Sequence, residues 1–400
     1  MRDLQANNPV RRVPVKLLKI GMTIVELDRP WVESPFNVHG FKIKSASEVT
    51  LLQQSCEYVY IALAKHSTDV AGQVLKRQTY RNTTSFQQAL PKAKSTHRQA
   101  KSVVKGLFKS LRLGQSFDSA VAKRTVKQCV DCVIANEEAM VWLGLLKDVD
   151  EYTAEHSLNV AMLSIVLGRQ VGLSPPDLET LGLCGMLHDM GKSEIPLDVL
   201  NKEGALTEQE FELMKSHSAR GYKILKEKSD ITPLAAEVAH SHHERLNGRG
   251  YPRQLKADDI AYFTRIVAIA DAYDAITSTR VYSPAKTALE GLQILTAAKK
   301  SHFDPELVDH FIEAIGIYPA GSVAELSTGE AAIVLATPRE HQRTPLVLVV
   351  RDHNKQPCEE RKLDLSQQPL DSSGKVIKIR HLYSNSAFGI DLKQYYGLLR

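Results

Sequence analysis

Apolar and polar positions follow three different patterns along the chain, and each pattern predicts a different kind of element. Residues 12–65 alternate short apolar runs, such as 13–17 and 23–27, with turn residues, which indicates a small α/β or β-rich N-terminal module. Residues 147–320 instead place apolar side chains at helical spacing. After residue 319, runs rich in β-branched residues predict a small β segment, and these runs are 331–336, 346–350 and 376–379.

Two helix starts are clear within the helical region. Ser174 precedes two prolines and Asp177, and Thr207 is followed three residues later by Glu210. Each start pairs an N-cap residue with an acid in the first turn, where free backbone N–H groups need acceptors. We therefore predict a mainly α protein with four parts. They are an N-terminal accessory or regulatory module (1–70), a basic linker with helices (71–145), a helical domain (146–320) and a small C-terminal β-rich segment (321–400).

Composition is typical of a soluble globular protein. The 400 residues are 43% hydrophobic and 24% charged, and no run of eighteen apolar residues occurs. The first fifteen residues are basic and lack the apolar stretch of a signal sequence. We therefore expect a cytoplasmic protein with no membrane partner.

The five cysteines are scattered along the chain, which favours reduced thiols over a disulfide framework. Cys129 and Cys132 form a C-x-x-C pair on a predicted amphipathic helix over residues 121–135. No second pair is present to complete a zinc site, so we favour core packing for these two residues over a metal or redox function.

Positive charge is concentrated in residues 71–127, which contain thirteen Lys or Arg and one acid, Asp118. Such a stretch could bind RNA, DNA or an acidic partner. It lacks interleaved aromatic residues and any nucleic-acid motif, however. We favour a solvated helical linker and do not expect nucleic-acid binding.

Histidines occur in unusual places within the helical region. His156 and His217 each lie on the apolar side of a predicted helix, where a single histidine is usually part of the core. His188 and Asp189 end another apolar helix, and a buried aspartate is costly without a positive partner. That partner is either a metal ion or Lys192 at i, i+3, and this segment alone leaves both open.

Two further features are difficult to explain by packing. His242 and His243 are adjacent imidazoles, and Asp271 interrupts the apolar run 266–270. Imidazole and carboxylate are ligands that divalent ions prefer, so the five histidines and two aspartates could surround two ions. Two ions about 3.5–4 Å apart suit displacement at phosphorus. The pattern therefore predicts phosphoester hydrolysis.

A glycine-rich turn follows the histidine pair at residues 247–252. Its glycines would allow the backbone to approach a phosphate closely, and Tyr251 could stack on a base. Turns of this kind are common, so its position beside His242 and His243 is what gives it weight.

These motifs resemble the HD-GYP family of bacterial cyclic di-GMP phosphodiesterases over about residues 150–315. The motif elements, in chain order, are His188-Asp189-x-Gly191-Lys192, Asp198-x-Leu200-Asn201-Lys202, His217, His242-His243-Glu244, Gly250-Tyr251-Pro252, Asp271-x-x-Asp274-Ala275, Arg280-x-Tyr282 and Phe303-Asp304-Pro305. Residues 21–41 also resemble a module found ahead of some HD-GYP domains. The resemblance implies an HD-type helical catalytic domain.

The resemblance also implies roles for individual residues. Asp189 and Lys192 would be catalytic, with Asp189 bridging two divalent ions that are iron or manganese in the family. Lys192 and Arg280 would hold the scissile phosphate, and Gly250, Tyr251 and Pro252 would line the substrate site. The implied metal ligands are His156, His188, Asp189, His217, His242, His243 and Asp271. Because these ligands include no thiolate, the residues themselves do not choose among Mn, Fe, Co, Ni and Zn.

Two positions depart from the family pattern. Some members with three metal ions have a glutamate four residues before the first histidine, whereas this chain has Tyr152, so we predict two ions. Many relatives carry a basic residue after the Arg-x-Tyr element, where this chain has Ser283. We therefore expect one phosphate contact to be missing and activity or affinity to be reduced, with no metal ligand removed.

We predict a bacterial signalling enzyme that hydrolyses cyclic di-GMP to linear pGpG and leave open a second round to GMP. One rival is a weak or inactive module that binds cyclic di-GMP or a protein partner, and the intact ligand set argues against it. The other is an HD hydrolase of another nucleotide, which the Gly-Tyr-Pro loop disfavours. The sequence does not determine the oligomeric state, any protein signalling partner or the input to the N-terminal module.

Overall fold

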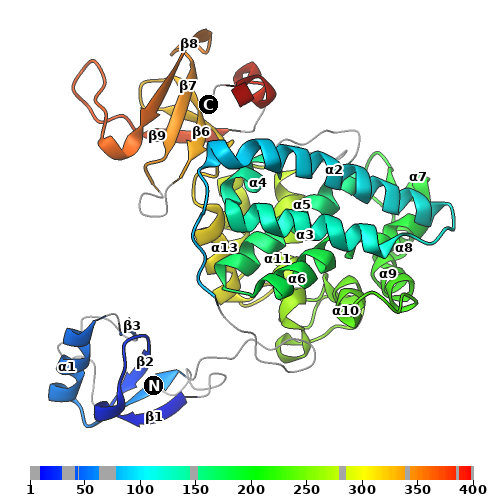
Figure 1. Ribbon diagram of the computed structural model, residues 1–400, viewed down its shortest axis with the longest axis horizontal. Coiled ribbons are helices and arrows are strands. Elements are labelled where there is room, and N and C mark those ends of the chain that lie inside the picture. The colour runs from blue at the N-terminus through cyan, green and yellow to red at the C-terminus, as the bar shows by residue number, and fades with distance from the viewer. Residues whose placement is uncertain are drawn as a thin grey trace. The chain divides into compact units, whose positions relative to one another are not determined.

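The computed structural model describes residues 10–28, 41–43, 45–62, 78–144, 152–278, 285–337, 343–383 and 387–397. The chain forms two compact units, residues 1–67 and 68–400 (Figure 1). Each contains its own hydrophobic core. The predicted fold class is confirmed, because the large unit is mainly helical and ends in a small sheet, while the small unit combines short strands with one helix.

The described residues of the small unit form an antiparallel sheet with strand order β1-β4-β2-β3 and the α-helix α1. A capping box between Ser45 and Glu48 starts α1, whose Leu52 is buried in the same core as Ile24 and Val59. The predicted strand over 13–17 is shorter than expected, because residues 15–17 form a 3-10 turn after Pro14. The bounds are β1 (Val10–Pro14), β2 (Thr23–Leu27), β3 (Phe41–Lys42), α1 (Ala46–Ser55) and β4 (Tyr58–Ala62). Residues 29–40 of the module resemblance lie outside the described residues.

The large unit begins with α2 (Phe86–Arg112), α3 (Ser119–Ala135) and α4 (Glu137–Gly144). The apolar stripe of α2 is buried in the main core of the unit, and its members are Leu90, Ala93, Ala100, Val104 and Leu107. This corrects the expectation of a solvated linker for the basic stretch. The basic residues are compatible with packing because they occupy the other faces of an amphipathic helix.

The C-x-x-C pair lies on α3, and both thiols are buried in the main core. Burial raises the pKa of the Cys129 thiol to about 12. The Cys132 thiol lies 3.5 Å from the hydroxyl of Thr96 on α2. The packing interpretation of this pair is confirmed.

The centre of the large unit is formed by α5 and α6, which pack against each other and contact α2, α3, α10, α11 and α13. The predicted starts at Ser174 and Thr207 are confirmed, since both side chains accept hydrogen bonds from the first turn. The bounds are α5 (Tyr152–Gln170), α6 (Pro175–Leu187), α7 (Leu197–Leu200), α8 (Glu208–Lys215), α9 (His217–Lys226), α10 (Pro233–Ser241), α11 (Tyr262–Thr277), α12 (Ala288–Ala297) and α13 (Pro305–Ile315).

The C-terminal strands form an antiparallel sheet with order β8-β7-β6-β5-β9. Alternate residues of β6 face two cores: Ile333 and Leu335 join the main core, whereas Ala332 and Val334 face a smaller one. Burial on both faces explains why this strand is apolar throughout. The predicted strand over 376–379 begins only at Ile379. The bounds are β5 (Val323–Leu326), β6 (Ala331–Ala336), β7 (Leu346–Arg351), β8 (Pro357–Asp364) and β9 (Ile379–Tyr383).

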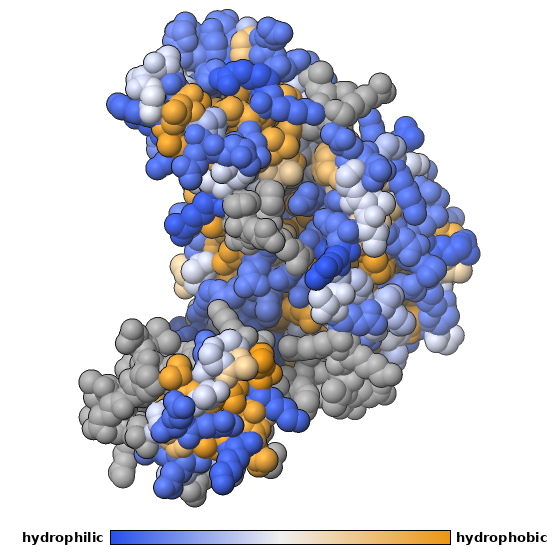
Figure 2. Space-filling model, turned by 60° about the vertical axis from the view of Figure 1, so that its left-hand side comes forward, coloured by the Kyte–Doolittle hydropathy of each residue, from blue (hydrophilic) through white to orange (hydrophobic). Residues whose placement is uncertain are grey.

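The surface of the large unit is largely hydrophilic in the view of Figure 2. Among the described residues, no helix combines the length and apolar character that crossing a membrane requires.

Candidate metal centre

Seven side chains from α5, α9, α11 and the turns after α6 and α10 meet at one centre. His156 lies just after the first turn of α5, and Asp271 lies in the middle of α11. The other five are in the turns after α6 and α10 or at the start of α9, and they are His188, Asp189, His217, His242 and His243. All seven are buried except His243, whose side chain is 27% exposed. The structure therefore brings together every residue of the predicted ligand set.

The carboxylate of Asp189 lies between two pairs of imidazoles. Its Oδ2 is 3.6 Å from His156 Nε2 and 3.3 Å from His188 Nε2. Its Oδ1 is 3.3 Å from His217 Nε2 and 3.7 Å from His242 Nε2. Two ligand atoms that bind one ion at about 2.1 Å lie about 3.0–3.4 Å apart. The distances to His188 and His217 fall in this range, and those to His156 and His242 exceed it by 0.2 and 0.3 Å, so each oxygen lies close to the spacing of a ligand shared with a different pair.

Asp271 completes the arrangement from α11. Its Oδ1 lies 3.0 Å from His156 Nε2, and its Oδ2 lies 3.8 Å from His243 Nδ1. The donors accordingly fall into two groups on either side of Asp189. One group is His156, His188 and Asp271, and the other is His217, His242 and His243.

Three of the histidines have their tautomer set by the backbone. In His188, His217 and His242, Nδ1 lies 2.7, 2.7 and 2.9 Å from the carbonyl oxygen three residues earlier. A carbonyl accepts only, so each Nδ1 carries the proton and donates it. Each Nε2 then keeps a lone pair directed into the centre, as in metal-binding histidines.

Several buried atoms of the centre have no partner of their own. His217 Nε2 and His242 Nε2 are 3.2 Å apart, although both carry lone pairs in this tautomer. Burial lowers the pKa of His217 to about 4 and that of His242 well below its usual range, so both rings are neutral. His188 Nε2 and Asp189 Oδ1 have no hydrogen-bond partner. Lone pairs facing one another in a buried site fit a bound cation.

Positive side chains adjoin the two carboxylates. Lys192 Nζ lies 2.5 Å from Asp189 Oδ2, so the ion pair that the sequence left open is present. Burial alone would raise the pKa of Asp189, but the ammonium of Lys192 holds it well below the usual range. Burial alone would lower the pKa of His156, but the carboxylates of Asp271 and Asp274 raise it to about 9. The carboxylates of Asp189 and Asp271 are therefore both ionised.

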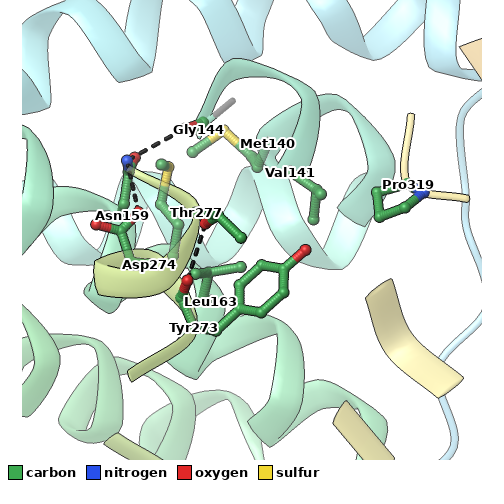
Figure 3. Close-up of a pocket in the computed structure, with 10 residues that line it drawn as sticks. Met140, Val141, Gly144, Asn159, Leu163, Tyr273, Asp274, Thr277 and Pro319 are labelled. Carbon is green, nitrogen blue, oxygen red and sulfur yellow. Dashed lines mark hydrogen bonds between the residues drawn. The ribbon is translucent and has the colours of Figure 1, made fainter. Parts of the chain in front are cut away.

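Asp274 orients the first histidine from behind. His156 Nδ1 lies 2.8 Å from Asp274 Oδ2, which leaves Nε2 directed at the centre. Asn159 donates to Asp274 Oδ1 at 3.1 Å and to the carbonyl of Gly144 at 3.1 Å (Figure 3). The sequence marked Asp274 as part of a motif without a role. Its place one turn after Asp271 on the same helix face was the available signal.

Gly191 allows two ligand segments to approach each other. A Cβ at this position would lie 1.9 Å from the carbonyl oxygen of His217 and 2.5 Å from the amide nitrogen of Gly221. The turn that follows Asp189 therefore packs directly on the backbone that carries His217. Only glycine permits this contact.

The Gly-Tyr-Pro loop is held by Glu244, a role the sequence did not reveal. The Glu244 carboxylate accepts from the amides of Arg253 at 2.7 Å and Leu255 at 2.9 Å. A Cβ on Gly250 would lie 2.5 Å from the Cα of Glu244, so the glycine serves close backbone packing. The ring centroid of Tyr251 lies 4.7 Å from that of His243.

A cleft of about 1350 Å³ opens over the centre. Of the predicted substrate contacts, Lys192 and Tyr251 line it, together with His217, His242, His243 and Asp271. Gly250 is buried and Pro252 is exposed, and neither is among the described residues that line the cleft. Arg280 and Ser283 lie outside the described residues. The cleft exceeds the 300–1,000 Å³ of ordinary small-molecule pockets, so it has room for a dinucleotide.

Known proteins resemble both parts of the chain. A family described as "HD domain" matches residues 141–307, and one described as "Domain of unknown function (DUF3391)" matches residues 10–122. A cyclic di-GMP phosphodiesterase of Pseudomonas aeruginosa is 34% identical over 352 residues, which are 85% of each chain.

Other relatives match the catalytic part. A cyclic di-GMP phosphodiesterase of Thermotoga maritima is 38% identical over 43% of this chain and 48% of its own length. A 3′3′-cGAMP-specific phosphodiesterase of Vibrio cholerae is 37% identical over 40% of this chain and 31% of its own. Because the Pseudomonas match extends over most of both chains and the HD motifs converge on one centre, this chain belongs to the HD-GYP family of metal-dependent phosphodiesterases.

Proposed function

We propose that the chain hydrolyses cyclic di-GMP to linear pGpG at a centre holding two divalent ions. The observation that carries this proposal is the position of Asp189, whose two oxygens each face a separate pair of imidazoles. The relative matched over 85% of both chains is named for activity on this nucleotide, which supports the choice of substrate.

One ion would be held by His156, His188 and Asp271, and the other by His217, His242 and His243, with Asp189 shared. When bound, two such ions supply an activated water and neutralise charge at the scissile phosphate. The donors are imidazoles and carboxylates, and we propose iron or manganese on the family resemblance.

Lys192 would bind the scissile phosphate. Its ammonium lies 2.5 Å from Asp189 Oδ2 and also lines the cleft, so it is within reach of a phosphate held beside the two aspartates. A lysine in this position acts as a point charge on a phosphate oxygen. When no phosphate is present, the ion pair between Lys192 and Asp189 offsets the free-energy cost of burying the Asp189 charge.

Aromatic side chains in the cleft would bind the bases. Tyr251 lines the cleft beside His243, and Phe211 lines it from α8 with 50% of its surface exposed. Lys215 Nζ lies 5.1 Å from the ring centroid of Phe211 and 5.8 Å from that of Tyr251. Exposed rings beside a cation favour stacking with planar bases.

The experiment is anaerobic purification and metal analysis, followed by incubation with cyclic di-GMP or 3′3′-cGAMP in Mn²⁺ or Fe²⁺ and chromatography of the products. About two metal ions per chain and faster production of pGpG from cyclic di-GMP are expected. Faster turnover of 3′3′-cGAMP would change the substrate assignment. Two ions without any product would favour a nucleotide-binding module, and no metal would contradict the centre itself.

A further inference from the structure

Helix α2 forms one wall of the cleft, although it precedes the residues that match the HD domain. Lys105, Phe108 and Arg112 line the cleft from this helix. Together with Lys101 they are spaced by four, three and four residues, which places them on one face beside the buried stripe. The α2 face therefore runs along the cleft for about two helical turns, from Lys105 to Arg112.

Two contacts bring this face close to the metal centre. Arg112 Nη2 donates to the carbonyl of Lys192 at 3.3 Å, and Lys192 contacts Asp189. Lys101 Nζ lies 2.5 Å from the carboxylate of Glu155, which precedes the ligand His156. Lys105 lies between these two contacts on α2, about 10 Å from Arg112 along the helix axis.

The charge along the described cleft lining favours an anion with more than one phosphate. Its basic residues are Lys105, Arg112, Lys192 and Arg245, and its acids are Glu244 and Asp271. Glu244 is used by the loop amides, and Asp271 faces the histidines. Lys192 is beside the centre, whereas the exposed side chains of Lys105 and Arg112 are outside it.

We propose that Lys105 and Arg112 bind the second phosphate of the cyclic dinucleotide while the first lies at the centre. This inference rests on the proposed function and adds a substrate contact to it. Residues 10–122 match the domain of unknown function, so part of the substrate site would come from that segment and not from the HD domain.

The test is the double variant Lys105→Ala/Arg112→Ala in the full chain. We expect KM for cyclic di-GMP to rise at least tenfold, while kcat changes less than threefold. The reason is that a contact to the non-reacting phosphate is equally present in the ground state and the transition state. Bis(p-nitrophenyl) phosphate has a single phosphodiester, so its KM should change less than threefold.

The matched control is Lys92→Ala/Lys109→Ala, which removes two exposed charges from the same helix outside the described cleft lining. Equal KM values for the two double variants would overturn the inference. A parallel loss of activity on both substrates, or of bound metal, would also overturn it, because α2 would then support the centre itself.

Isothermal titration with cyclic di-GMP separates this inference from the proposed function. If the wild type binds the nucleotide without hydrolysing it, the catalytic proposal fails. A Kd at least tenfold weaker in the Lys105→Ala/Arg112→Ala variant would still support the inference, whereas an unchanged Kd would overturn it. A wild type that neither binds nor hydrolyses the nucleotide contradicts both.

Discussion

Asp189 connects the two groups of donors, because each of its oxygens faces a different pair of imidazoles. In Asp189→Asn one oxygen becomes an amide nitrogen, which is a poor metal ligand. We expect the loss of at least one metal ion per chain and a fall in kcat of about 100-fold or more. Metal analysis and turnover of cyclic di-GMP measure both effects.

A matched control for this substitution is Asp309→Asn, which alters a carboxylate paired with Lys299 on the surface of α13. It should change neither metal content nor turnover. Turnover retained by Asp189→Asn would contradict the shared carboxylate.

Asp274 holds His156 without facing the other ligands, so its removal should weaken the centre and leave the fold intact. Asp274→Asn removes the negative charge that strengthens the 2.8 Å hydrogen bond from His156 Nδ1 to Asp274 Oδ2. This hydrogen bond fixes the orientation of the His156 ring. Loss of a partner that orients a metal-binding histidine reduces metal affinity by about 10–100-fold. Titration of the metal-free variant with Mn²⁺ measures the loss.

Ser278→Ala is the control for Asp274→Asn, because Ser278 also donates to Asp274 Oδ2, at 3.2 Å, and is not one of the predicted ligands. Its metal affinity should stay within threefold of the wild type. Equal losses in the two variants would mean that the carboxylate acts through helix packing and not through His156.

At the residue scale, the sequence revealed ligands better than it revealed their supports. Two adjacent imidazoles and a carboxylate inside an apolar run are conspicuous, and this made His242, His243 and Asp271 recognisable. Asp274 accepts a hydrogen bond from His156, which lies 118 residues earlier in the chain, and Glu244 accepts from the amide of Arg253 in the loop that follows it. The pairing of Asp274 with His156 depends on a tertiary contact, which has no local pattern.

At the scale of elements, the centre depends on a close backbone contact between the turn after α6 and the start of α9. In Gly191→Ala the new Cβ would lie 1.9 Å from the carbonyl oxygen of His217. The two ligand segments must then separate, so we expect several kcal/mol of destabilisation and loss of bound metal. Chemical denaturation and metal analysis would measure both effects.

Gly106→Ala is the opposite case on α2, because a Cβ added there would meet no atom of another element within 4 Å. Replacing glycine in a helix without a clash should stabilise the protein by about 0.5–1 kcal/mol. A Gly191→Ala variant as stable as Gly106→Ala would show that the two segments tolerate separation.

Elements with strong local signals were predicted well, whereas those set by tertiary contacts were not. The caps at Ser174 and Thr207 and the strand over 331–336 follow from local patterns. Helix α2 was expected as a solvated linker, since thirteen basic residues over 71–127 obscure its apolar stripe. The apolar stripe can be recognised as part of a core only when α3, α4 and α5 are known to pack against it.

At the scale of the whole molecule, the match to the domain of unknown function crosses the boundary between the two units. It covers residues 10–122, whereas the first unit ends at residue 67 and α2 belongs to the second. The segment therefore combines a module that has its own core with a helix that completes the catalytic unit.

A chain that begins at Gln78 should therefore fold and retain its metal ions. Its backbone is anchored from the start, since Gln78 donates to Gly172 and the Tyr80 hydroxyl donates to the carbonyl of Leu173 at 2.7 Å. We expect one cooperative unfolding transition within a few degrees of that of the second unit in the full chain. Calorimetry and metal analysis would measure this.

A chain that begins at residue 115 should fail, because it lacks α2. The lost stripe holds five buried apolar residues, and the larger ones contribute about 1.5–3 kcal/mol each. Their sum approaches the net stability of a domain, about 5–15 kcal/mol. Cooperative unfolding by the shorter chain would show that α2 is an appendage. Failure of the chain from Gln78 would instead place the small unit within the catalytic fold.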